Sequence, residues 1–232
     1  MRFIILFLAA THTLHLDVVD ARGKKPSGVA VEAGNAGPDG WRKLTIARSK
    51  KDSVIVWPFD ALAVEPDGPG AVQVVVIERG DSKALANPEI AADIATGVVL
   101  GRESLADAAK RTGFDATALK SAFASAANAT DDYAGGVGLL WTNQQVRAVD
   151  FLAKALRERE RQLTRVPSDI FPAAMLDAKA LFDSGKYDDA AAVYLKARKL
   201  RPSDAGVRKS RAEALTKAGK EDAARELLGQ AK

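Results

Sequence analysis

The chain of 232 residues contains no cysteine, which excludes disulfides, thiolate catalysis and every cysteine-ligated metal site. Aromatic residues make up only 6% of the sequence, so any core must be built mainly from alanine, leucine and valine. Hydrophobic residues reach 47%, which is enough to form such a core. An alanine-rich core is typical of closely packed helices, and the length allows one large domain or two small ones.

Long runs of one charge are also absent. Lysine and arginine alternate with aspartate and glutamate through most of the chain, and the net charge is +4. Nucleic-acid-binding proteins usually gather basic residues on one face, so this pattern does not favour a nucleic-acid partner.

No apolar run reaches the roughly 20 residues that span a bilayer. Met1 and Arg2 precede a short apolar run over residues 3–10, a pattern similar to a secretory signal. Residues 1–12 are therefore a candidate signal segment, with a buried strand or helix as the other interpretation. We expect a periplasmic or secreted protein; the alternative is a cytoplasmic one.

Residues 13–80 have a β pattern. Apolar residues alternate over 14–19, and Val- and Ile-rich segments at 41–48, 53–57 and 71–78 are separated by Gly/Pro turns. Short strands between such turns predict a small antiparallel β-sandwich.

The first of these turns carries a family resemblance. Residues 16–31 read LDVVDARGKKPSGVAV, an Asp-x-x-Gly-x-Pro turn followed by Gly-Val-x-Val. This resembles the opening of carboxypeptidase-regulatory-like and transthyretin-like β-sandwich domains. In the turn, Gly23 can supply a positive φ, Pro26 fixes the exit, and Gly28 allows the next strand to approach.

Residues 85–165 have a helical pattern. Pro88 suits the first turn of a helix that runs to about Val99. Ser104 and Asp115 are expected to cap helices over 105–112 and 116–127. The glycine-rich segment 131–138 is predicted to be a break or linker. A long helix over 143–165 follows.

Residues 168–232 contain two similar segments, LFDSGKYDDAA from Leu181 and LTKAGKEDAA from Leu215. Their glycines, Gly185 and Gly219, lie 34 residues apart. That period, with a glycine turn between two alanine-rich helices, resembles the tetratricopeptide repeat (TPR). The first unit keeps more of the pattern than the second, where Glu221 replaces the tyrosine. The positions that match are Gly185, Tyr187, Ala190, Tyr194, Ala197 and Pro202, then Gly219, Ala224, Leu228 and Ala231.

The TPR resemblance implies a non-enzymatic module that binds another protein or peptide, with no cofactor and no metal. It places ligands on the concave face formed by the first helix of each unit. Projected onto this chain, that face comprises Met175, Lys179, Phe182, Lys209, Glu213 and Thr216. Glu213 stands where families that grip a C-terminal carboxylate have asparagine, so that type of ligand is not expected. Fewer than two full units are recognised, so the helix over 143–165 is expected to cover the first.

Two alternatives use other segments. Residues 104–127 resemble a helix-turn-helix, with Ala109, Gly113 and Leu119 at its small, turn and hydrophobic positions; its second helix carries only Lys120 as a charge. A DNA-binding regulator is the alternative that this segment suggests. The transthyretin-like class also includes hydroxyisourate hydrolases, which suggests a hydrolase that uses His12 or His15 as a weaker alternative. Those enzymes also need a later histidine, an arginine in a central strand and a C-terminal Tyr-Arg-Gly-Ser sequence, and none of these is present here.

Together these patterns predict an α+β protein in two parts. A small antiparallel β-sandwich is followed by an all-α region ending in TPR-like hairpins. The expected role is a protein-interaction module or scaffold of the bacterial cell envelope.

Overall fold

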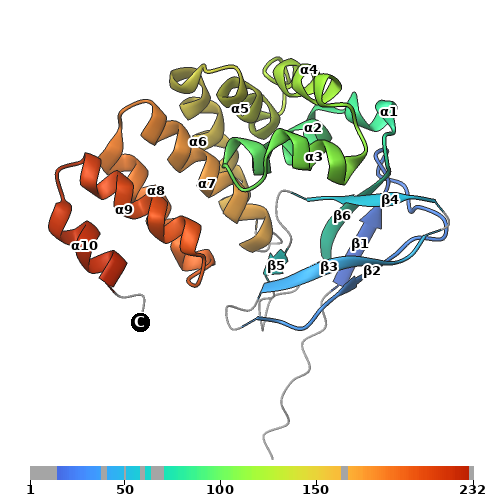
Figure 1. Cartoon of the computed structure of the whole chain (residues 1–232), viewed down its shortest axis with the longest axis horizontal. Helices are drawn as coiled ribbons and strands as arrows, with labels where there is room; N and C mark the ends of the chain where they lie inside the picture. The colour runs from blue at the N-terminus through green and yellow to red at the C-terminus, as the bar shows by residue number, and fades with distance from the viewer. Residues whose placement is uncertain are drawn as a thin grey trace, which may run out of the picture.

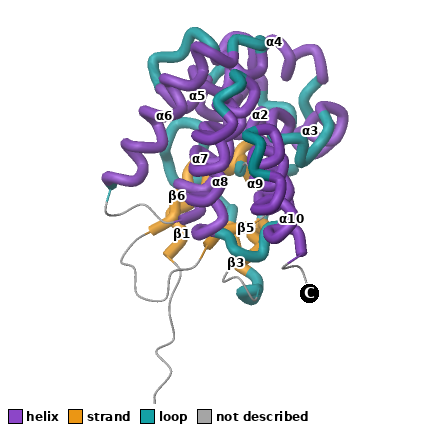
Figure 2. The backbone as a smooth tube through the Cα atoms, turned by 90° about the vertical axis from the view of Figure 1, so that its left-hand side faces the viewer, coloured by secondary structure: helices purple, strands orange, loops and turns teal. Residues whose placement is uncertain are grey.

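A computed structural model describes residues 15–37, 41–49, 51–57, 61–63, 71–162 and 167–229. The strands form the N-terminal part and the helices follow as a curved row that ends at α10, far from the sandwich (Figure 1). Figure 2 shows the strands gathered at one end of the molecule with the helices against them. The predicted α+β layout, with the β part first, is therefore confirmed.

The strands are β1 (His15–Val19), β2 (Ala30–Ala33), β3 (Trp41–Arg48), β4 (Ser53–Val56), β5 (Ala61–Ala63) and β6 (Ala71–Glu78). The helices are α1 (Ser82–Leu85), α2 (Pro88–Val99), α3 (Leu105–Thr112), α4 (Ala116–Ala126), α5 (Asp132–Trp141), α6 (Gln145–Arg161), α7 (Pro167–Asp183), α8 (Tyr187–Leu200), α9 (Ala205–Lys217) and α10 (Glu221–Gly229).

Two three-stranded sheets make the sandwich, in the orders β1-β6-β4 and β2-β3-β5. Leu44 of one sheet packs in a cluster with Val72, Val74 and Val76 of the other. One pairing differs from the antiparallel expectation, because β1 runs parallel to β6. The two strands are far apart in sequence, so no hairpin pattern could indicate this pairing.

The turn after β1 contains the predicted glycine with a positive φ, but the strand that follows it does not pair with β1. The Asp20 carboxylate accepts hydrogen bonds from the Arg22 and Lys24 backbone amides, and Gly23 has φ 71° as expected. Gly28 also has a positive φ of 71°. Since β2 pairs with β3 rather than with β1, the turn carries the chain from one sheet to the other.

Three predicted helix starts are confirmed in detail. The Asn87 side chain accepts from the Glu89 amide, directly before Pro88. Ser104 and Asp107 form a reciprocal capping box at α3, and Asp115 caps α4. Such caps satisfy backbone amides that have no partner inside a helix, which makes these boundaries readable from sequence.

The prediction of a linker over 131–138 is wrong, because these residues lie in α5. Asp131 caps this helix, and residues 133–140 are all buried. A Cβ added at Gly138 would lie 2.1 Å from the Ala127 nitrogen, and one at Gly136 would lie 2.5 Å from Leu152 Cγ. The glycines therefore permit close contact with α4 and α6 rather than flexibility.

With α5 present, the array contains three hairpins that close in the same way: α5–α6, α7–α8 and α9–α10. Asn143, Gly185 and Gly219 stand at the three turns with φ values of 58°, 82° and 75°. The amide of the next residue bonds the carbonyl four residues before each turn residue, at 2.8, 2.9 and 2.9 Å. This left-handed ending satisfies the last carbonyls of the first helix and reverses the chain.

The second helices of the hairpins also share a register. Alanine, a large apolar residue and alanine follow Asn143 at Ala148, Leu152 and Ala155, with the offsets seen after Gly185 and Gly219. Leu152 and the equivalent Tyr194 are 0% and 5% exposed. The predicted cover for α7 is thus confirmed as α6, and it belongs to a hairpin of its own. Three units meet the usual minimum for a stable helical array.

Candidate functional site

The candidate site is the face of the two C-terminal hairpins that the TPR resemblance assigns to ligands. Met175, Lys179 and Phe182 precede Gly185 by the same intervals that separate Lys209, Glu213 and Thr216 from Gly219. The first three lie on α7 and the other three on α9.

On α9 the predicted residues form one exposed stripe. Lys209, Glu213 and Thr216 are all exposed and follow the spacing of four and three residues that lines one side of a helix. The Thr216 hydroxyl donates to the Ala212 carbonyl at 3.0 Å, so it is partly engaged by its own helix. We call these three residues the α9 stripe.

The opposite side of α9 explains why the stripe faces outward. Val207, Ala214 and Leu215 are buried and belong to the main hydrophobic cluster. Asp204 caps the helix by accepting from the Val207 amide at 3.0 Å, and the basic residue Lys217 lies in its last turn. Packing on one side and capping at the end therefore fix the orientation of the stripe.

On α7 the equivalent positions are less accessible. Met175 is only 3% exposed, and every residue over 171–178 is buried. Lys179 is half-buried and forms an ion pair with Asp183 at 2.8 Å. Phe182 is half-buried and makes an edge contact with Tyr187 at 5.3 Å between ring centroids. Three of the six predicted residues are therefore exposed to solvent, two are half-buried, and Met175 is buried.

The sandwich packs against the same region of α7. Trp41, the first residue of β3, makes an edge contact with Phe171 at 5.4 Å between centroids. Its indole nitrogen donates to the Leu200 carbonyl at 3.3 Å, at the end of α8. The Arg201 guanidinium lies 4.4 Å from the Trp41 ring centroid, a cation–π contact. Among the described residues, the strands thus cover the beginning of α7 and not α9.

The loop between α8 and α9 is held by a residue from outside the hairpins. Arg102, in the turn after α2, donates to the Asp204 carboxylate through two nitrogens at 3.1 Å. Asp204 therefore caps α9 and joins the loop to the N-terminal half of the array. This contact fixes the base of the α9 stripe.

Two ionisable residues occupy equivalent positions behind the face, where Asp177 is buried and Arg211 is half-buried. Burial raises the pKa of the Asp177 carboxyl to about 6, against the opposing effect of Lys196 and Arg157. Asp177 Oδ1 is buried and has no hydrogen-bond partner among the described residues. At the same position of the next unit, burial and the nearby Arg198 lower the pKa of Arg211. The buried Asp177 carboxylate therefore lowers the stability of the fold when it is charged.

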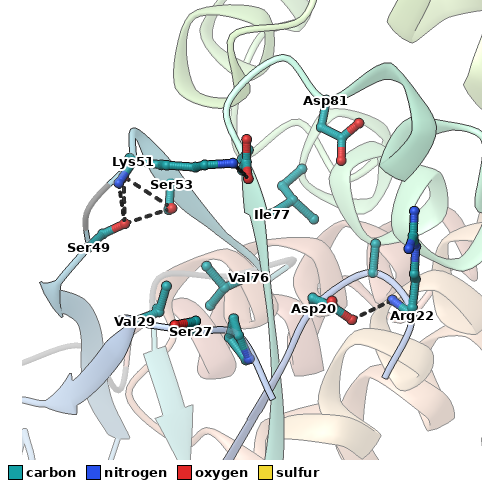
Figure 3. Close-up of a pocket in the computed structure, with 13 residues that line it drawn as sticks. Asp20, Arg22, Ser27, Val29, Ser49, Lys51, Ser53, Val76, Ile77 and Asp81 are labelled. Atoms are coloured by element: carbon teal, nitrogen blue, oxygen red, sulfur yellow. Dashed lines mark hydrogen bonds and ion pairs between the residues drawn. The ribbon is translucent and has the colours of Figure 1, made fainter. Parts of the chain in front are cut away.

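A cavity of about 490 Å³ lies at the edge of the sandwich, away from the helical face (Figure 3). Ser49 and Ser53 point toward one another there and bond at 2.9 Å, while the Ser49 hydroxyl also donates to the Lys51 carbonyl. The Lys51 ammonium pairs with Glu78 instead of with a serine. These serines therefore support a turn.

The residues of the two alternative functions lie as follows. His12 is outside the described residues, and His15 is the first residue of β1. The helix-turn-helix-like segment forms both helices, α3 and α4, with Gly113 at φ 74° between them. On α4, Leu119, Phe123 and Ala126 are buried, and Lys120 is on the exposed side.

Across the described residues, no group of three or more histidine, aspartate or glutamate side chains is placed to hold a metal ion. In the same part of the chain, no helix combines the length and apolarity that a membrane crossing requires.

Residues 181–232 match the family described as Tetratricopeptide repeat. The matched segment starts in the last turn of α7 and takes in α8, α9 and α10. Together with the two hairpins, the match supports a TPR region at the C-terminal end. No curated protein and no solved structure matches the chain.

The α5–α6 hairpin is the part of the array that sequence reasoning missed. Its second helix carries a signal, because Ala148, Leu152 and Ala155 repeat the spacing of Ala190, Tyr194 and Ala197. Its turn residue is Asn143, and asparagine is the residue after glycine that most readily adopts a positive φ. A repeat pattern that allows asparagine as well as glycine at the turn position therefore includes this hairpin.

Proposed function

We propose that this protein is a non-enzymatic scaffold that binds a protein partner through the α9 stripe. The observation that carries the proposal is the exposure of Lys209, Glu213 and Thr216 on one side of a well-packed helix. TPR regions generally bind proteins or peptides, and the family match covers this helix. A rigid helix that offers both charges and a hydroxyl suits recognition of a polar peptide surface.

The partner surface extends from α9 toward the open edge of α7. Lys179 and Phe182 are half-buried, and a bound segment can contact them without displacing the sandwich. Met175 is not part of this surface, because it is covered. The proposed site is therefore shorter than the six-residue face that the repeat pattern predicts.

We also propose that the scaffold works in the bacterial cell envelope. The support is the apolar run over residues 3–10 after Arg2. Fractionation of cells that express the full chain tests this part separately, and recovery in the cytoplasm alone would contradict it.

Charge reversal on the stripe tests the binding role. Lys209→Glu and Glu213→Lys should reduce cross-linking to specific partners at least about fivefold, since one lost charge contact is worth about 1 kcal/mol. Lys199→Glu is the matched control, because Lys199 is exposed on α8 and lies off the first-helix face. Cross-linking in living cells followed by quantitative mass spectrometry gives the readout.

The decisive pattern is a group of partners lost with both stripe variants and retained with Lys199→Glu. Equal recovery of all partners by the three variants would remove the α9 stripe as the binding site. Thermal melts of each variant confirm that the fold is kept, which is expected because all three lysine and glutamate side chains are exposed.

A further inference from the structure

Three arginines gather where α8 meets α9, at the end of the helical row that lies far from the sandwich (Figure 1). Arg198 is in the last turn of α8, and Arg208 and Arg211 are three residues apart on α9, which places them on the same side of that helix. All three side chains are half-buried. We call these residues the arginine cluster. The exposed Lys199 is not part of it, because consecutive residues of a helix point to different sides.

The packing of α9 fixes Arg211 in the cluster. Val207, Arg211 and Leu215 follow one another at intervals of four residues, so they form one row along the helix. Val207 and Leu215 are buried, and the apolar stem of Arg211 continues their row. The Arg211 Nε is buried and has no hydrogen-bond partner among the described residues. The guanidinium is therefore held in place by its stem rather than by an acceptor.

The carboxylate nearest to the cluster in sequence is already engaged. Asp204 is one turn before Arg208, but its oxygens accept from Arg102 at 3.1 Å and from the Val207 amide at 3.0 Å. Glu213 is the one carboxylate within α9, and it belongs to the α9 stripe on another side of the helix. Within the part of the chain that the structure describes, none of the three clustered guanidiniums makes an ion pair or a hydrogen bond.

Like charges therefore face one another at the junction of α8 and α9. Burial and the nearby Arg198 lower the pKa of the Arg211 guanidinium, which places the two charges within electrostatic range. An anion between them would turn this repulsion into two attractions.

Cations elsewhere in the helical array have partners on their own or neighbouring helices. These ion pairs are Lys154–Asp132, Lys179–Asp183, Lys196–Glu160, Lys220–Asp188 and Arg225–Asp222. The arginine cluster differs from them, because its positive charge has no counterpart in the described array.

The acidic helix α10 limits the length of this positive surface. α9 carries four cationic residues and one carboxylate, whereas α10 carries three carboxylates and one arginine. The two helices pack against each other. A long polyanion that followed α9 would also approach α10 and be repelled by it. A short run of carboxylates fits the positive strip alone.

We propose that the arginine cluster binds a short acidic segment of the partner protein, whose aspartate or glutamate carboxylates pair with Arg198, Arg208 and Arg211. This inference rests on the proposed scaffold role and adds the chemical class of the partner. Guanidinium groups bind carboxylates through two parallel hydrogen bonds, which favours arginine at such a site. Side-chain carboxylates supply the charge, so the segment needs no free C-terminus.

Fluorescence anisotropy with a defined peptide tests the proposal on the full-length protein. The probe is hexaglutamate with fluorescein at its N-terminus and an amidated C-terminus. It should bind in a saturable way at low ionic strength and more weakly as NaCl is added. Hexaglutamine with the same end groups should bind at least about tenfold more weakly, because it lacks the charge. Equal binding of the two peptides would overturn the proposal.

Arginine-to-methionine variants remove charge and keep an apolar stem. Arg208→Met and Arg211→Met should each raise the Kd for hexaglutamate at least about fivefold, because each removes one charge contact. Arg147→Met is the matched control, since Arg147 is exposed on α6, and it should leave the Kd unchanged. An unchanged Kd in both cluster variants would overturn the proposal.

Thermal melts separate a binding role from a structural one. Arg211→Met should keep or raise the Tm, because it removes a half-buried charge that has no partner among the described residues. A lower Tm together with an unchanged Kd would mean that Arg211 serves the fold instead. If Arg211→Met does not fold, the exposed edge of the cluster is still tested by Arg208→Met.

Two competitors distinguish an acidic protein segment from other anions. They are a single-stranded hexamer of deoxythymidylate and phosphatidylcholine vesicles containing phosphatidylglycerol. Unlabelled hexaglutamate should displace the probe at a lower concentration than either competitor. Displacement by the nucleic acid or by the vesicles at a lower concentration than by hexaglutamate would overturn the proposal.

The scaffold role and the acidic class of its partner fail in different ways. If partners depend on the α9 stripe but Arg208→Met and Arg211→Met leave hexaglutamate binding unchanged, the scaffold role stands and the acidic partner is excluded. If the cluster variants weaken hexaglutamate binding but the stripe variants lose no partner, the acidic site stands and the α9 stripe is excluded.

Discussion

The interior hairpins and the terminal hairpin of the helical array share a register and differ in what surrounds them. Ten residues before the turn, α7 has the buried Met175 and α9 has the exposed Lys209. Nine residues after the turn, α6 has Leu152 at 0% exposure and α10 has Leu228 at 51%. The same repeat position is therefore core in one unit and surface in the next. Repeat patterns locate helices and turns, but the neighbours of each unit decide which faces can bind.

The largest difference in stability between the interior and terminal hairpins is expected when a glycine is replaced by alanine. Gly138→Ala should lower the free energy of unfolding by about 4 kcal/mol, because the new Cβ would meet backbone atoms of residues 126 and 127 at 2.1 to 2.7 Å. Gly229→Ala, at the end of α10, meets nothing within 4 Å and should be neutral or stabilising by up to about 1 kcal/mol. Denaturant unfolding of both variants measures the contrast. Similar stabilities would show that α5 does not pack against α4 as closely as described.

A smaller contrast is expected at the large apolar position of the second helices. Leu152→Ala should cost about 3 kcal/mol, because it leaves a cavity between α5, α6 and α7. Leu228→Ala should cost less than about 1 kcal/mol, because half of that side chain is already in water. Equal losses in urea melts would mean that α10 is covered in solution, for example by another copy of the chain.

The last effect is expected at Asp177 and depends on pH. The folded pKa of about 6 is above the ordinary value of 3.8, so the folded state holds this proton more tightly than the unfolded state does. The free energy of unfolding therefore falls as the pH rises from about 4 to about 6. Asp177→Asn should remove that fall, and the free energy of unfolding of this variant should exceed that of the original protein by about 3 kcal/mol at pH 7, with little gain at pH 4.

The groups that face Asp177 are Arg157 and Glu160 on α6 and Lys196 on α8. Lys196 already pairs with Glu160 at 3.1 Å, which limits its help to the buried carboxylate. Asp183→Asn on the same helix is the control, because Asp183 is exposed and paired with Lys179. A gain for Asp177→Asn that is the same at pH 4 and pH 7 would exclude titration as its cause.

Features that depend on residues close together in the sequence were predicted accurately, and features that depend on distant residues were not. Helix starts at Pro88, Ser104 and Asp115 are local, and the caps made them predictable within a residue. The parallel pairing of β1 with β6 joins distant segments and left no local signal. The glycines of α5 gave a misleading signal, because low helix propensity was outweighed by close packing against α4 and α6. At the candidate site, Lys209, Glu213 and Thr216 on α9 are exposed, whereas the equivalent Met175 on α7 is buried by neighbours that the repeat pattern does not encode.

Trp41 has a consequence for how the chain is made. Its indole bonds the Leu200 carbonyl across 159 residues of sequence. A ribosome therefore releases β3 long before α8 exists, while each helical hairpin can close as soon as its own turn emerges. Contacts of such long separation form late and slow the folding of the whole chain. Until α8 is complete, the Trp41 indole, which is 3% exposed in the folded protein, lacks its Leu200 acceptor.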